Sequence, residues 1–103
     1  MKRYDKLVRD RIPQIIREDG RSCRTRTRGQ EEYLSRLEDK LREELDEYLQ
    51  SGSMEELADL CEVIRAVAAA RGSSMEKIEA LRARKAQQRG GFGGRILLID
   101  VTD

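Results

Sequence analysis

Two amphipathic helical segments joined by a short turn limit the folds that this chain can adopt. In residues 30–50, and again in residues 53–71, apolar side chains recur every three or four positions, which is the spacing of one helix face. Since a short turn at residues 50–53 joins the two segments, we expect an antiparallel helical hairpin. The two apolar stripes comprise Leu34, Leu37, Leu41, Leu45 and Tyr48 in the first helix, and Leu57, Leu60, Cys61, Ile64, Val67 and Ala68 in the second.

Shorter helices are predicted on both sides of the hairpin. Pro13 favours the first turn of a helix that runs to about Glu18. Ser73, with Glu76 three residues later, predicts the capped start of a further helix that runs to about Gln88.

The two flanks of the helical region have the patterns of short strands. Residues 22–28 alternate between arginines and smaller side chains, and residues 95–101 are mostly apolar. Two such strands can pair, although an ordered arginine-rich loop is an equal alternative for residues 22–28. The predicted fold is therefore mainly α, a single domain over residues 1–103 built as an antiparallel helical bundle with short terminal strands that can pair.

The composition indicates a small core and excludes several functional classes. Of the 103 residues, 38% are hydrophobic and 40% are charged, so we expect the helices to share a core with other copies in a homodimer or tetramer.

A net charge of +1 does not point to a nucleic-acid partner. Without histidine, the chain lacks the commonest general base and the usual zinc ligand. With no signal peptide and no apolar run of about 18 residues, we expect a cytoplasmic protein without a membrane partner.

Each helix of the predicted hairpin carries two carboxylates three positions apart, a spacing that puts both on one face. The pairs are Glu44 with Glu47 and Glu56 with Asp59. Glu47 and Glu56 lie about three residues from the turn, and Glu44 and Asp59 about six, so an antiparallel hairpin brings them level. Four convergent carboxylates repel unless a cation lies between them. Oxygen ligands favour a hard divalent cation, Mg²⁺ first and Mn²⁺ as an alternative.

A simpler interpretation of the same residues has comparable weight. Charged residues on a helix usually form a solvated face. Ser53 followed by Glu56 is also a capping box, and acidic residues are favourable near any helix N-terminus. On this interpretation Glu56 only caps the second helix, and no metal binds.

The ordered motifs resemble a known enzyme family. The pattern Glu-Glu-x-x-Glu from Glu43, followed after a short spacer by Glu-x-x-Asp from Glu56, is similar to the signature of the MazG-type all-α nucleoside triphosphate pyrophosphohydrolases. Residues 4–13 resemble the start of a phosphoribosyl-ATP-pyrophosphohydrolase-like subgroup, and Lys85 with residues 89–92 resembles its end. The resemblance covers nearly the whole chain in order.

This resemblance implies a Mg²⁺-dependent cleavage of a nucleoside triphosphate between its α and β phosphates, giving a nucleoside monophosphate and pyrophosphate. One role of such a reaction is to remove unusual nucleotides. Without histidine, a carboxylate must accept the proton of the attacking water, and the sequence does not choose between Glu43 and Glu47. The metal ligands would be Glu44, Glu47, Glu56 and Asp59, and the phosphate-binding residues Lys85, Arg89, Lys6 and Arg9.

Two other functions compete with this hypothesis. Instead of binding phosphate, Lys85 and Arg89 can simply provide the positive charge that is favourable at a helix C-terminus. The segment around Lys6 and Arg9 can instead pack beneath the helices without binding a ligand. A non-catalytic helical dimerisation module would need no metal. A nucleic-acid-binding module would use the row Arg24, Arg26 and Arg28, and its affinity would fall steeply with salt.

Overall fold

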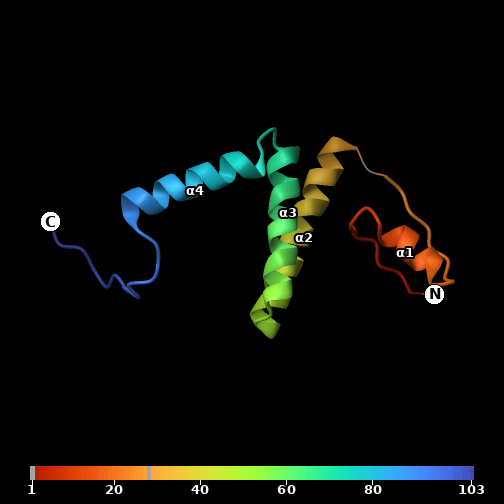
Figure 1. Ribbon diagram of the computed structural model, residues 1–103, viewed down its shortest axis with the longest axis horizontal. Helices are drawn as coiled ribbons and strands as arrows, with labels where there is room; N and C mark the ends of the chain where they lie inside the picture. The colour runs from red at the N-terminus through yellow and green to blue at the C-terminus, as the bar shows by residue number, and fades with distance from the viewer. Residues whose placement is uncertain (1, 28) are drawn as a thin grey trace.

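The computed structural model describes residues 2–27 and 29–103, and this part of the chain contains four α-helices (Figure 1). They are α1 (Ile12–Glu18), α2 (Gln30–Ser51), α3 (Met54–Ala70) and α4 (Met75–Arg89). α2 and α3 run antiparallel side by side and provide most of the packing between helices. None of these four helices is long and apolar enough to span a membrane. The predicted mainly α fold and its central hairpin are confirmed.

The turn between α2 and α3 is held by its own residues. Gly52 adopts a left-handed conformation with φ at 66°, which an L-residue rarely adopts, and its N–H donates to the Tyr48 carbonyl oxygen at 2.7 Å. Ser53 then caps α3, because its Oγ accepts from the Glu55 N–H at 3.1 Å. This short turn fixes which residues of the two helices lie level.

The hairpin core is small, as the composition predicted. Leu37 of α2 and Val63 and Ala68 of α3 are the buried apolar residues of the part of the chain that the structure describes. Leu45 and Cys61, which the predicted stripes include, are exposed. On a helical wheel Cys61 lies roughly 60° from the centre of the α3 stripe, which is one edge of that stripe.

The fourth helix leaves the hairpin at the end opposite the α2–α3 turn and points away from it (Figure 1). It begins one residue later than the sequence predicted. Ser74, not Ser73, is its N-cap, because the Ser74 Oγ accepts from the Lys77 N–H at 3.2 Å. The molecule is consequently elongated, with extents of 63 × 31 × 23 Å.

The predicted terminal strands are wrong. Residues 22–27 and 95–101 form no strand, while Arg28 lies outside the described residues. A strand needs a partner for its backbone N–H and C=O groups. The two segments lie near opposite ends of the long axis, so neither can pair with the other (Figure 1).

Candidate metal centre

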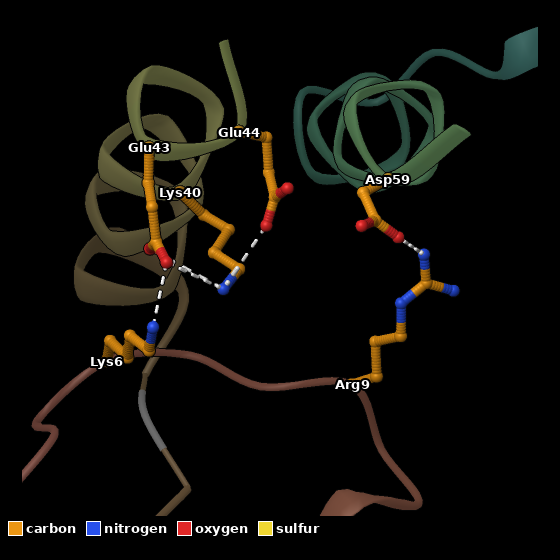
Figure 2. A network of polar contacts seen from close by, with 6 residues as sticks. All are labelled: Lys6, Arg9, Lys40, Glu43, Glu44 and Asp59. Carbon is orange, nitrogen blue, oxygen red and sulfur yellow. Dashed lines mark hydrogen bonds and ion pairs between the residues drawn. The ribbon is translucent and has the colours of Figure 1, made fainter. Parts of the chain in front are cut away.

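Three of the predicted carboxylates converge on one face of the hairpin. One oxygen from each of Glu44, Glu56 and Asp59 lies within 4.8 Å of the other two. α2 supplies Glu44, and the beginning of α3 supplies the other two, so the Gly52 turn sets their register. Figure 2 shows Glu44 and Asp59 facing each other across the hairpin. Two oxygens that bind Mg²⁺ from opposite sides lie about 4.2 Å apart, so a small movement of the side chains would let these three oxygens bind one divalent cation.

The buried end of this group is the carboxylate of Glu44, whose side chain is only 8% exposed. Its Oε1 lies 3.5 Å from the Lys40 ammonium, but its Oε2 is buried without a hydrogen-bond partner. Burial raises the pKa of Glu44, and the negative charges of Glu47 and Asp59 raise it further, against the opposing effect of Lys40. A buried, unpartnered carboxylate oxygen beside two other carboxylates fits the donor set of a hard cation.

Lys40 is a residue of this face that the sequence analysis missed. Its ammonium lies 3.5 Å from both Glu43 and Glu44, three and four positions further along α2, and its side chain is 19% exposed. The signal was present, because oppositely charged residues at these spacings pair on a helix. Lys40 therefore pairs with one oxygen of Glu44 and leaves the other unpartnered.

Glu47 lies beside this group rather than within it. Its side chain is exposed and is not among the three whose oxygens lie within 4.8 Å of one another. Desolvation raises the pKa of Glu56, and a hydrogen bond with Glu47 and the charges of Glu47 and Asp59 raise it further. The predicted four-carboxylate site is therefore a group of three with Glu47 adjacent to Glu56.

The capping interpretation of Glu56 does not describe the observed cap. In a capping box, the glutamate accepts a hydrogen bond from the backbone N–H of the N-cap residue. Here the Ser53 N–H donates to the Ser51 Oγ at 3.1 Å instead. The carboxylate of Glu56 is directed to the acidic group, as its interaction with Glu47 indicates.

Two cations of the N-terminal segment, Lys6 and Arg9, reach the same face, whereas their predicted binding of phosphate stays a prediction. The Lys6 ammonium lies 2.8 Å from the Glu43 carboxylate, and the Arg9 guanidinium lies 2.7 Å from the Asp59 carboxylate (Figure 2). Burial favours a higher pKa for Glu43, but the hydrogen bond from Lys6 and the charge of Lys40 outweigh it, so the pKa falls. The same hydrogen bond raises the pKa of Lys6.

Within one chain, the structure does not bring Lys85 and Arg89 to the acidic group. Both are exposed near the C-terminal end of α4, and of the other described helices α4 packs only against α3. Because α4 starts at the end of the hairpin away from the Gly52 turn and points outward, its last residues extend away from the carboxylates (Figure 1).

Comparisons of the chain with models of known protein families, with curated proteins and with solved structures gave no match. The resemblance to the MazG-type enzymes therefore rests on the residues and motifs of this chain. The geometry of the acidic group is an independent observation, since it depends only on the folded hairpin.

We predict that Glu44→Gln stabilises the metal-free protein at neutral pH. The pKa of Glu44 in the folded protein is above its ordinary value of 4.5, so its stabilising contribution is complete below pH 4.5 and is lost as the pH rises through the folded value. Glutamine stays neutral throughout. In a chelator, the melting temperature of the variant should exceed that of the wild type at neutral pH by several degrees, as about 1 kcal/mol gives in a small domain.

This gain should shrink below pH 4.5, where the wild-type carboxyl is also neutral. Asp46→Asn is the matched control, because it removes one negative charge from an exposed position of α2 outside the group of three. Equal gains in both variants would contradict the prediction, since they would reflect general charge reduction rather than the burial of Glu44.

Proposed function

We propose that this chain is a MazG-like, divalent-cation-dependent nucleoside triphosphate pyrophosphohydrolase that releases pyrophosphate and a nucleoside monophosphate. One observation carries the proposal: the oxygens of Glu44, Glu56 and Asp59 lie within 4.8 Å of one another, and Glu44 contributes a buried oxygen that has no partner. The ordered motifs along the chain support the same activity. Its cytoplasmic location, expected from the sequence, stays a prediction.

The chain's own residues would divide the work between metal binding and proton transfer. Glu44, Glu56 and Asp59 would hold Mg²⁺ or Mn²⁺, with Glu47 alongside. When bound, the cation would neutralise charge on the phosphates and lower the pKa of a coordinated water. The two candidate bases are in different surroundings. Glu43 is paired with two lysines that make it a weaker base, which leaves Glu47 as the other candidate proton acceptor.

The positive side chains on this face suit an anionic substrate. Lys6 and Arg9 lie beside the carboxylates, where they could bind the phosphates of a nucleotide held by the cation. Arginine and lysine bind phosphate through charge-assisted hydrogen bonds, whatever the base. The base and sugar specificity would therefore depend on other contacts.

A panel of ribonucleoside and deoxyribonucleoside triphosphates, incubated with the purified protein and Mg²⁺, tests the proposal. We expect pyrophosphate and nucleoside monophosphate in equal amounts, separated and quantified by anion-exchange chromatography. Release of orthophosphate and nucleoside diphosphate would mean cleavage of the other phosphoanhydride bond. No turnover of any nucleotide by correctly folded protein would refute the activity.

We also propose that the active form is a homodimer or tetramer. One chain buries little apolar surface, and a contiguous apolar segment follows the last helix, which on soluble proteins usually marks an interface. This C-terminal segment consists of residues 91–103 and begins at the Gly90 cap of α4. Its large apolar side chains, each 75–100% exposed, are Phe92, Ile96, Leu97, Leu98, Ile99 and Val101.

Sedimentation at micromolar concentration should give the mass of two or four chains. Assembly would also offer Lys85 and Arg89 a route to the acidic group of another subunit. Mixing the inactive variants Asp59→Asn and Arg89→Ala should then restore part of the activity, because some mixed assemblies contain one intact site. A fully active monomer would contradict both expectations.

A further inference from the structure

A charged N-terminal segment crosses the face of the hairpin on which the carboxylates converge. We call residues 5–9 the strap. Its polar contacts reach both long helices, so the strap bridges α2 and α3 over the acidic group, as Figure 2 shows for its two cations. The contacts join the Asp5 carbonyl oxygen to Arg36 at 3.2 Å, Lys6 to Glu43 at 2.8 Å, and Arg9 to Asp59 at 2.7 Å.

Mainly charge and hydrogen bonding hold the strap in place. None of its residues is buried, and only Leu7 is half-buried. Arg9 and Asp59 are 57% and 41% exposed, and an ion pair this exposed contributes little net stability. Asp5 also has φ at 51°, a left-handed conformation that is uncommon for residues other than glycine. The strap can therefore leave this face at a small cost in free energy.

The carboxylate of Asp59 belongs both to the strap and to the acidic group. It pairs with Arg9 and also contributes an oxygen to the group of three. A divalent cation held by that group would lie close to the Arg9 guanidinium, and like charges at such separations repel. Coupling of this kind is reciprocal: a cation that loosens the strap is itself bound more weakly by the same factor.

We propose that the strap is a displaceable cover of the acidic group, in which Arg9 takes the place of a divalent cation at Asp59 until that cation releases it. The proposal rests on the cation site of the proposed function and adds a competitor that the chain itself supplies. Once Asp59 is released, the Arg9 guanidinium is free to bind the phosphates of an anionic ligand held by the cation.

The affinity for Mn²⁺, measured by titration with electron paramagnetic resonance of the free ion, tests the competition. Arg9→Gln should bind Mn²⁺ about three- to fivefold more tightly than the wild type, the gain expected when one exposed ion pair no longer competes. Arg11→Gln is the matched control, because it removes the same charge two residues along, from an exposed position that forms no ion pair with the other described residues. Unchanged or weaker binding by Arg9→Gln would overturn the proposal.

The order of the strap gives a second, independent measurement. In ¹⁵N relaxation experiments, adding Mg²⁺ to the wild type should lower the heteronuclear NOE of residues 5–9 and leave α2 unchanged. In Arg9→Gln these values should already be low without Mg²⁺. A strap that keeps its order when Mg²⁺ binds would refute displacement.

The two proposals fail in different ways. If the wild type binds Mn²⁺ and hydrolyses nucleotides, but Arg9→Gln binds Mn²⁺ no more tightly, the strap is refuted and the enzyme stands. If the wild type binds Mn²⁺ and Arg9→Gln binds it more tightly, but no nucleotide is hydrolysed, the strap stands and the enzyme is refuted. If the wild type binds no divalent cation, both proposals are refuted.

Discussion

Asp59→Asn should remove nearly all nucleotide hydrolysis while leaving the fold intact. Its carboxylate is one of three whose oxygens lie within 4.8 Å of one another, and asparagine keeps the shape but loses the charge. Loss of a residue that hydrogen-bonds to a metal ligand typically lowers metal affinity or activity by about 10- to 100-fold. Loss of a ligand itself should therefore lower kcat/KM by at least about 100-fold. Pyrophosphate release measures the activity, and circular dichroism checks the helices.

Two further variants separate the explanations of such a loss. Asp46→Asn removes the same charge from an exposed position of α2 and should retain activity. Glu56→Gln preserves the hydrogen-bonding shape at the start of α3, so a pure capping role predicts wild-type turnover. We expect Glu56→Gln to be as impaired as Asp59→Asn. Wild-type turnover in Glu56→Gln would mean that Glu56 is not a metal ligand.

Excess EDTA should abolish activity, and Mg²⁺ or Mn²⁺ added back should restore it. Within the described residues the acidic group offers only carboxylate oxygens, which favour these hard cations. Binding should also stabilise the fold, by about 2.7 kcal/mol when the cation is at 100 times its dissociation constant. Thermal melts with and without Mg²⁺ measure this gain, which Glu44→Gln should largely lose. Full pyrophosphate release in excess EDTA would refute the metal mechanism.

The hairpin could be predicted because its determinants are local. The spacing of apolar residues predicted α2 and α3, and the short turn with its glycine predicted that the two helices run antiparallel. The convergence of Glu44, Glu56 and Asp59 followed from counting residues outward from that turn, because an antiparallel pair of helices keeps equal distances level. These predictions needed no knowledge of the rest of the chain.

The features that were wrong or missed depend on longer-range packing. Residues 22–27 and 95–101 have strand-like composition, but a strand forms only where a partner is within reach. Ser73 and Ser74 are both suitable caps, and only the backbone conformation selects Ser74. The contacts of Lys6 and Arg9 with the hairpin span 37 and 50 positions of the chain, so no local pattern could have chosen their partners.

The two-residue link between α2 and α3 has a consequence for how such a chain can diverge. An inserted residue early in α3 would rotate everything after it by about 100° and carry Glu56 and Asp59 away from Glu44. Three or four inserted residues would turn Glu56 and Asp59 back toward α2, but would shift both along the helix axis by about one turn relative to Glu44. We therefore expect homologous sequences that keep the three carboxylates to match changes of length on both sides of the turn, whereas the link between α3 and α4 should vary in length freely.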